Sequence, residues 1–345
     1  MTESNAVAGR SGNTNWDLLG HEWAVDMLRQ QVAHGSMRHA YLFTGPPGVG
    51  RRTLALRFVQ ALNCTQPPAP GEACGICRDC NQIASMQHPD LAVIEAEQEG
   101  GTLKVDQIRE MGHSLSLNPY QARFRVALFL RFQEANDSAA NALLKTLEEA
   151  PQFVILMLTA DNPEQLLPTI VSRCEVLRLR PSSIEAVDAF LRSRGADAGQ
   201  AGLLAHVSGG RTGYALRLLD DPALLELRGE RLDDLLKLLS SSRVERFTYA
   251  RKLTPEKDLD TSRHNLLQAF LIWLSLWRDV MLHTVKANIP VINIDRKVEI
   301  ESMANQMSLP QSRSMVADLE KAIERLEKKV NPRLLAEVLL LDWPH

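Results

Sequence analysis

The sequence has few aromatic residues and no long run of apolar residues. Aromatic side chains make up 5% of the 345 residues. The most apolar stretch, residues 266–282, contains Arg278 and Asp279 and is too short to cross a bilayer. Residues 1–15 are polar, lack the apolar core of a secretory signal and are predicted to be disordered. These absences argue against a membrane or secreted protein, and we expect a cytoplasmic one.

The chain also lacks a marked excess of charge and is poor in cysteine. Its formal net charge is −3, so overall electrostatic attraction to nucleic acid is not expected, and any such contact must be local. Four of the five cysteines lie within residues 64–80, which in a reducing compartment favours a metal site over disulfides. The length is sufficient for two or three domains.

What the sequence does contain is a glycine-rich turn between an apolar strand and a helix. The spacing G-x-x-x-x-G over residues 45–50 is that of a phosphate-binding loop, where small residues let backbone N–H groups point at an anion. Two positions depart from the pattern, because Arg51 replaces the lysine and Arg52 replaces the magnesium-binding hydroxyl. The candidate nucleotide-contacting residues are Gly45, Pro46, Pro47, Gly48, Val49, Gly50, Arg51, Arg52 and Thr53.

The substitutions in this loop predict that ATP is not hydrolysed. The planar guanidinium of Arg51 is a poor replacement for a compact ammonium, and Arg52 offers a metal ion a positive charge. The apolar strand predicted at 125–132 also lacks the Asp-Glu pair that holds magnesium and polarises water in active hydrolases, since Leu130 and Arg131 stand there. Passive binding of ATP or ADP stays open.

The cysteines follow the pattern Cys64-x9-Cys74-x2-Cys77-x2-Cys80. Thiolates at this spacing predict a closed tetrahedral zinc site with a structural role, because no coordination position is left for a substrate. The pairs separated by two residues are also compatible with redox chemistry, although no thioredoxin-like sequence surrounds them. Four unligated thiols are the less favoured interpretation, since such regular gaps rarely arise by chance.

Apolar runs alternate with helical patterns up to about residue 180, which predicts a mostly parallel sheet covered on both faces. The predicted strands cover residues 40–43, 90–94, 125–132, 153–158 and 175–179. The predicted helical segments are 16–34, one from Arg51, one from Val105 with Asp106 as a possible N-cap, 136–149 capped by Asp137 or Ser138, and 162–170. Thr159, at the end of a strand, is expected to be a hydrogen-bonded hydroxyl rather than a γ-phosphate sensor.

From residue 181 the pattern is wholly helical. Three short helices are predicted within 184–219, and a further helical region starts near residue 222. The helix predicted at 265–284 has one apolar face, which is compatible with a ligand pocket but more typical of a core or a subunit interface. The residues of this face are Phe270, Trp273, Leu274, Trp277 and Met281.

Five motifs occur in one order: the segment 39–50, the four-cysteine module, Val105-Asp-Gln-Ile-Arg109, the segment 141–149 and Ser172-Arg-Cys174. Together they resemble bacterial DNA polymerase III clamp-loader subunits of the AAA+ class. The resemblance implies an α/β region followed by an all-α region. An AAA+ parallel-sheet P-loop domain would cover 16–180 with a zinc module inserted at 64–80, followed by a three-helix lid domain at 181–221 and a helical collar (oligomerisation) domain at 222–345.

The resemblance also implies a function. The altered phosphate loop and the missing acids point to the delta-prime branch of the family rather than the ATP-hydrolysing gamma/tau motor. Arg173 matches the arginine finger that reaches a neighbouring subunit's ATP site, with an ordinary surface salt bridge as the alternative. The implied partners are the gamma/tau and delta subunits, with the sliding clamp and primed DNA reached through the complex. Cys174 is expected to have no chemistry.

Other readings remain open at this point. One is an active gamma/tau-like ATPase with a variant phosphate loop. Another is a stand-alone nucleic-acid-binding protein that uses its zinc module, against which the balanced charge and the lack of aromatic residues between the cysteines count. In the predicted lid, Gly213 stands where motor subunits carry a second sensing arginine, and Arg211 lies nearby.

Overall fold

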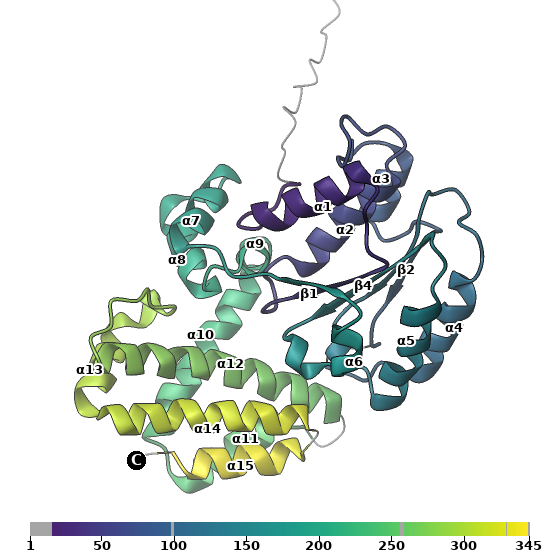
Figure 1. The fold of residues 1–345 in the computed structure, drawn as a ribbon. Coiled ribbons are helices and arrows are strands. Elements are labelled where there is room, and N and C mark those ends of the chain that lie inside the picture. The colour runs from purple at the N-terminus through teal and green to yellow at the C-terminus, as the bar shows by residue number, and fades with distance from the viewer. Residues whose placement is uncertain (1–15, 98–99, 256–258, 329, 344–345) are drawn as a thin grey trace, which may run out of the picture. The chain divides into compact units, whose positions relative to one another are not determined.

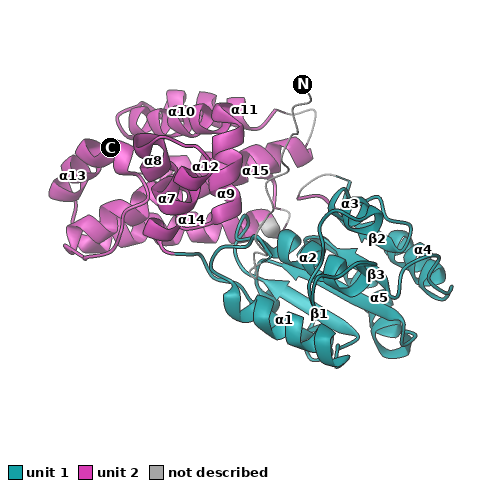
Figure 2. Cartoon of the chain, turned by 90° about the horizontal axis from the view of Figure 1, so that it is seen from above, with its two compact units in different colours: residues 1–97, 102–182 teal, residues 98–101, 183–345 magenta. Residues whose placement is uncertain are grey.

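The chain is built from two units. The computed structural model describes residues 16–97, 100–255, 259–328 and 330–343. Residues up to 97 together with 102–182 form unit 1, and residues from 183 onward form nearly all of unit 2 (Figure 2). The expected disordered segment 1–15 lies outside the described residues.

Unit 1 contains a five-stranded sheet with helices on both faces (Figure 1). Its strands are β1 (Ala40–Thr44), β2 (Leu91–Ile94), β3 (Arg125–Phe129), β4 (Val154–Ala160) and β5 (Glu175–Arg178). Its helices are α1 (Glu22–His34), α2 (Arg51–Asn63), α3 (Arg78–Ala84), α4 (Val105–Leu115), α5 (Asp137–Glu149) and α6 (Pro168–Val171), with 3-10 turns at Phe132–Glu134 and Pro163–Gln165.

All strand pairs in this sheet are parallel, and their order is β2-β3-β4-β1-β5. The central strand β1 pairs with β4 on one side and β5 on the other, so Phe43 lies opposite both Thr159 and Leu177. The predicted parallel sheet is therefore confirmed. The same register places the segments that follow β1, β4 and β5 at one edge of the sheet.

Alternating side chains of the strands pack into two separate cores. In β1, Tyr41 and Phe43 join the core that includes α1 and α2, whereas Ala40 and Leu42 join the core that includes α4 and α5. This alternation follows from the two-residue period of a strand. Because both faces are covered, the central strands are apolar throughout, which explains why the sequence shows continuous apolar runs there.

Several predicted boundaries in unit 1 were wrong for local reasons. The first helix begins at Glu22 rather than residue 16, because Trp16 and Asp17 have positive φ angles of 48° and 58°. Strand β3 ends at Phe129, and Arg131 adopts a left-handed conformation with φ 50°.

Two predicted helix caps were also wrong. The N-cap of α5 is Asn136, whose Oδ1 accepts a hydrogen bond from the amide of Ala139 at 2.8 Å. The N-cap of α4 is Lys104 rather than Asp106, and the amide of Lys104 donates to Gln107 Oε1 at 3.0 Å. In each case the residue one or two places earlier holds the extended backbone that precedes the helix.

Unit 2 is entirely helical in its described part. Its helices are α7 (Ile184–Ser193), α8 (Ala198–Ser208), α9 (Thr212–Asp220), α10 (Pro222–Leu239), α11 (Arg243–Leu253), α12 (Leu259–Thr284), α13 (Lys297–Gln306), α14 (Leu309–Glu327) and α15 (Pro332–Leu341). The three short helices predicted within 184–219 are confirmed as α7, α8 and α9. The division of this unit into a lid at 181–221 and a collar at 222–345 stays a prediction.

The aromatic face of α12 forms the core of unit 2. Phe270, Trp273 and Trp277 are fully buried among side chains of α10, α11, α14 and α15, and Trp273 Nε1 donates to the carbonyl of Arg231 at 2.8 Å. The expectation of a packing role for this face is thus confirmed. None of the helices in the described ranges is long and apolar enough to cross a bilayer.

A buried polar network holds the segment between α12 and α13. Arg228 of α10 forms a bidentate ion pair with Asp295 at 2.8 and 2.9 Å and also donates to Asn293 Oδ1 at 2.6 Å. The fully buried Asp279 of α12 accepts from the backbone amides of Ile292 and Asn293. The charges are tolerated inside the protein because each is hydrogen-bonded to a fixed partner.

In unit 1 a single buried carboxylate orders the segment that leads into β3. Asp90 accepts hydrogen bonds from the backbone amides of Tyr120 at 2.7 Å and of Gln121 and Ala122 at 2.9 Å each. Burial by itself raises the pKa of Asp90, but these amides outweigh it and the pKa is lowered. A carboxylate whose pKa is lowered in the folded state stabilises the fold at pH values above the ordinary carboxyl pKa. This contribution is lost as the pH falls through the folded-state pKa.

Replacing Asp90 by asparagine is therefore expected to reduce the free energy of unfolding at pH 7 by about 2 kcal/mol. The substitution puts an NH₂ group where one of the carboxylate oxygens accepts. The difference from the wild type should shrink as the pH falls below about 4. Urea unfolding at several pH values measures it. The exposed control Asp106→Asn should stay within about 0.5 kcal/mol of the wild type, and an equal loss in both variants would contradict the prediction.

Candidate functional site

The glycine-rich loop connects β1 to α2 at the carboxyl edge of the sheet. Gly45, Gly48 and Gly50 have φ angles of 143°, 83° and 114°, in the region that side chains disfavour. A Cβ atom on Gly45 would lie 2.5 Å from the carbonyl oxygen of Leu179, so only glycine fits there. The glycine pattern thus produces a tight turn between β1 and α2 with three positive φ angles, and Gly50 is the N-cap of α2.

The two arginines of the loop have different surroundings. The Arg51 side chain is 10% exposed, and its Nη1 lies 2.6 Å from Oδ1 of Asp161, which follows β4. The amide of Gly45 also donates to the carbonyl of Asp161 at 3.1 Å. Arg52 and Thr53 are exposed. The side chain at the lysine position of the motif is therefore already paired with a carboxylate of the same chain.

The side chains of His21 and Asp161, both outside the motif, also contact the loop, and neither was predicted from the sequence. His21 is buried, and its Nε2 lies 2.9 Å from the carbonyl oxygen of Val49. A signal for Asp161 was present in the sequence, because it lies two residues beyond Thr159 and so at the same sheet edge as the loop. His21 gave no signal, since it precedes the first helix without any motif.

The end of β3 differs from that of an active hydrolase. Leu130 is buried, and Arg131 turns into a left-handed conformation that directs its side chain toward two acids. Its Nε lies 2.9 Å from Glu134 and its Nη2 lies 3.2 Å from Glu95. These carboxylates neutralise a cation of the chain itself.

Thr159 on β4 is hydrogen-bonded within the sheet, as expected. Its Oγ1 accepts from the amide of Arg131 at 2.9 Å and donates to the carbonyl of Phe129 at 3.4 Å. Both the donor and an acceptor function of the hydroxyl are used. Thr159 therefore ties the end of β3 to β4 and has a structural role.

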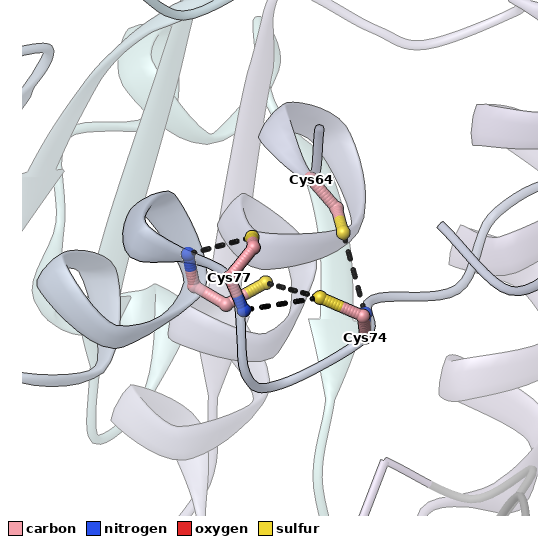
Figure 3. A group of neighbouring side chains, drawn as sticks. Cys64, Cys74 and Cys77 are labelled. Atoms are coloured by element: carbon pink, nitrogen blue, oxygen red, sulfur yellow. Dashed lines mark hydrogen bonds between the residues drawn. The ribbon is translucent and has the colours of Figure 1, made fainter. Parts of the chain in front are cut away.

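The four predicted metal ligands come together between α2 and α3. Cys64 follows α2, Cys77 is the N-cap of α3, and the sulfur atoms of Cys64, Cys74, Cys77 and Cys80 all lie within 4.8 Å of one another. Figure 3 shows the side chains of Cys64, Cys74 and Cys77 gathered in this cluster. The group can hold a metal ion, because four thiolates at this separation match a tetrahedral site.

Backbone amides point at the sulfur atoms of this cluster. The amides of Cys74, Cys77 and Cys80 donate to the sulfurs of Cys64, Cys74 and Cys77 at 3.3, 3.3 and 3.4 Å. Burial raises the pKa of the Cys77 thiol, but the Cys80 amide and neighbouring side chains outweigh this effect and lower the pKa to about 6. Burial raises the pKa values of Cys64 and Cys80. Amide donors of this kind favour the thiolate form that binds a metal.

Arg173 lies on the surface of unit 1, after the short helix α6. Its Nη2 forms an ion pair with Glu148 Oε1 of α5 at 2.6 Å, and its Nη1 donates to the carbonyl of Thr169 at 2.8 Å. The side chain is 37% exposed. The adjacent Cys174 is partly buried, and burial raises the pKa of its thiol to about 12, so it is unreactive at neutral pH.

One family model matches the part of the chain that carries these residues. The family model described as DNA polymerase III, delta subunit, matches residues 20–183, which contain the loop, the cysteines and Arg173. The DNA polymerase III subunit delta' of Bacillus subtilis is 26% identical over 92% of this chain and 94% of its own length. The chain resembles the DNA polymerase III delta-prime subunits.

Two further relatives match about half of this chain each. The delta' subunit of Pseudomonas aeruginosa is 38% identical over 45% of this chain, and the tau subunit of Escherichia coli is 33% identical over 50% of it. The chain spans about half of the length of the first relative and about a quarter of the second, at 47% and 26%. A solved DNA polymerase III gamma subunit-related protein of Thermotoga maritima aligns with 92% of this chain and 97% of its own at 18% identity and a TM-score of 0.42.

Within unit 2, the arginine nearest to the predicted sensing position is occupied internally. Arg211 Nε donates to the carbonyl of Ser208 at 2.6 Å, and its guanidinium lies 4.7 Å from the centre of the Tyr214 ring. Burial lowers the pKa of Arg211. Gly213 lies in α9, one residue before that tyrosine. Arg211 therefore contributes to the packing of α8 against α9.

The close approach of Gly45 to Leu179 generates a prediction about the loop. Replacing Gly45 by alanine should reduce the free energy of unfolding by more than about 2 kcal/mol, because the new Cβ overlaps a backbone oxygen that cannot move independently. The matched control is Gly112→Ala in α4, where the nearest atom would lie 3.7 Å from the new Cβ. There the higher helix propensity of alanine should increase the free energy of unfolding by at most about 1 kcal/mol. Urea unfolding of both variants checks this, and equal stabilities would contradict it.

Proposed function

We propose that this chain is a non-catalytic, delta-prime-like subunit of a DNA polymerase III clamp loader. It completes the ring that loads the sliding clamp onto primed DNA and supplies Arg173 to the ATP site of a neighbouring motor subunit. The observation that carries the proposal is the contrast within unit 1 between two arginines. Both pair with an acid of the same chain, but the Arg51 side chain is 10% exposed, whereas the Arg173 side chain is 37% exposed and lies on the surface.

The absence of hydrolysis in this subunit is supported at both sites that an ATPase needs. Arg51 and Arg52 replace the lysine and hydroxyl of the loop, and Leu130 and Arg131 replace the acidic pair. These are the positions at which active hydrolases carry the magnesium-binding hydroxyl and the acids that hold magnesium and polarise water, so this chain lacks those groups at those positions. Resemblance to delta-prime subunits agrees with this, since the altered loop is what separates this chain from the gamma/tau pattern.

The surroundings of Arg173 suit a role in trans. Phosphoryl transfer places negative charge on the γ-phosphate oxygens, and an arginine from another subunit stabilises it. In the isolated chain the same guanidinium already binds one carboxylate oxygen of Glu148, which is more exposed than Arg173 itself at 53%. An exposed ion pair of this kind is weak, so exchanging the carboxylate for a phosphate costs little.

The partners proposed for this chain are the gamma/tau and delta subunits. The helices α10–α15, residues 222–341, would form the collar through which the ring assembles, and α7–α9 would form the lid. Contact with DNA would go to phosphates through basic side chains, because loading does not depend on sequence. The similarity to the Bacillus subtilis delta' subunit, which spans both units, supports this extension beyond unit 1.

We also propose that the four cysteines hold a structural zinc ion. The sulfur atoms are close enough for one ion, and three backbone amides supply donors to them. Zinc accepts four thiolates in tetrahedral geometry without redox chemistry. When bound, it would cross-link the ends of α2 and α3 through a loop rich in proline and glycine that buries little apolar surface.

The second candidate is an active ATPase with a variant loop. The retained backbone geometry at Gly45, Gly48 and Gly50 favours it. It requires ATP turnover by a complex whose motor subunits carry inactivated phosphate loops. Turnover by such a complex would also rule out the first proposal.

The arginine-finger role predicts a specific loss in the assembled complex. Arg173→Ala should reduce the rate of ATP hydrolysis at the neighbouring motor site by at least about 100-fold, with normal ring assembly. The measurement is single-turnover hydrolysis in a complex where only that motor site is active. The control Arg178→Ala removes an equally cationic and more exposed side chain of β5 and should leave the rate unchanged. An unchanged rate in both variants would refute the role.

The zinc proposal predicts one zinc ion per chain in protein purified without chelators. Cys74→Ser should lose the metal and reduce the free energy of unfolding by several kcal/mol, because binding stabilises only the folded form. Elemental analysis and thermal unfolding measure both effects. Cys174→Ser, which lies outside the cluster, should retain the metal. Full metal content in the Cys74 variant would count against the proposed ligand set.

A further inference from the structure

We infer that Asp161 is an internal ligand of the phosphate loop, whose carboxylate takes the place of a bound phosphate and keeps the loop closed to nucleotides. The altered loop residues explain the loss of hydrolysis. They do not by themselves explain a loss of binding, because two arginines beside a helix N-terminus attract anions. The residue that decides binding lies 110 positions away in the sequence.

The ion pair between Arg51 and Asp161 is short and shielded from solvent. Nη1 of Arg51 lies 2.6 Å from Oδ1 of Asp161, and the two side chains are 10% and 30% exposed. A charge-assisted hydrogen bond of this length in such a place is stronger than one on an open surface. The guanidinium at the lysine position is therefore already bound to an anionic oxygen.

The backbone around Asp161 closes the same site. The carbonyl of Asp161 accepts from the amide of Gly45, the first glycine of the loop, and the amide of Val49 donates to the carbonyl of Pro46 at 3.2 Å. Nε2 of His21 lies 2.9 Å from the carbonyl oxygen of Val49. The amides of Gly45 and Val49 thus have hydrogen-bond partners inside the chain. In an open phosphate loop, by contrast, the loop amides point at the ligand.

An incoming polyphosphate would have to separate this pair. It would meet the negative charge of Asp161 at the position where its own oxygens need Arg51, and the repulsion acts at short distance in a partly buried place. The fold supplies the carboxylate at no cost in translational entropy, since β4 and β1 are paired side by side, with Thr44 opposite Ala160. An internal ligand has this advantage over a ligand that comes from solution.

This inference deepens the proposed silent nucleotide site and rests on that part of the proposed function. It is tested on the isolated full-length chain, without partner subunits. Its failure would therefore leave the role of Arg173 untouched, and a failure of the Arg173 role in the complex would leave this inference standing.

The experiment measures binding of tripolyphosphate and of ATP to the wild type and to Asp161→Asn, by titration calorimetry without magnesium and at low salt. Tripolyphosphate probes the loop alone. Asp161→Asn retains the shape and the backbone hydrogen bond but removes the charge. We expect its affinity for both ligands to exceed that of the wild type by at least about tenfold. The double variant Arg51→Ala/Asp161→Asn should lose the gain, because the guanidinium is then missing.

The matched control is Glu164→Gln. Glu164 lies three residues from Asp161, and its side chain is exposed and 3.7 Å from Arg178 rather than Arg51. The Glu164→Gln variant should bind tripolyphosphate and ATP with wild-type affinity. A folded Asp161→Asn variant with wild-type affinity would overturn the inference, as would an equal gain in Glu164→Gln or a wild type that already binds as tightly as the variant.

A stability cycle keeps the inference testable if Asp161→Asn folds poorly. The melting temperatures of the wild type, Arg51→Ala, Asp161→Asn and the double variant are compared. If the ion pair closes the loop, the double variant melts above the temperature that the sum of the two single effects predicts. Additive shifts would show that Arg51 and Asp161 do not interact, and would overturn the inference.

Discussion

The parallel pairing of β1 with β4 is the constraint on which the site depends. It places the glycine-rich loop, which follows β1, beside Thr159 and Asp161, which end and follow β4. The pairing of β1 with β5 adds the carbonyl of Leu179, against which Gly45 packs. In a parallel sheet these segments share one edge because all strands run in one direction. Both neighbours contact Gly45, Asp161 through its carbonyl and Leu179 at van der Waals distance.

Three arginines of unit 1 at positions that the sequence motifs single out are each paired with an acid of the same chain. Arg51 pairs with Asp161, Arg131 with Glu134, and Arg173 with Glu148. Their side chains are 10%, 24% and 37% exposed, in that order. Since an ion pair is harder to separate where water is excluded, this order ranks the arginines by their availability to another molecule. Only the last has the accessibility that a finger acting in trans requires.

The cysteine cluster and the polar network of unit 2 solve a similar problem in different ways. The segment that carries Cys74 and Cys77 contributes little to the apolar core, and its conformation depends on hydrogen bonds from backbone amides to cysteine sulfurs that lie close enough together to hold a metal ion. In unit 2, Arg228, Asn293 and Asp279 order a segment between two helices through buried hydrogen bonds. Both arrangements replace apolar burial by directional interactions, which specify geometry more narrowly.

The sequence by itself determined the parallel sheet, the loop backbone, the cysteine cluster and the helical second half. Each of these depends on a local pattern: the apolar run of a covered strand, the glycine spacing of residues 45–50, the gaps between Cys74, Cys77 and Cys80, or the helical period of the α12 face. It did not determine the cap at Asn136, where neighbouring polar residues offered equal alternatives. Only the tertiary structure decided the partners of Arg51 and of Val49. Strand pairing and helix packing bring Asp161 and His21 to the loop. Which of the chain's acids and histidines contacts Arg51 or Val49 depends on distance in space, and a local sequence pattern does not encode that distance.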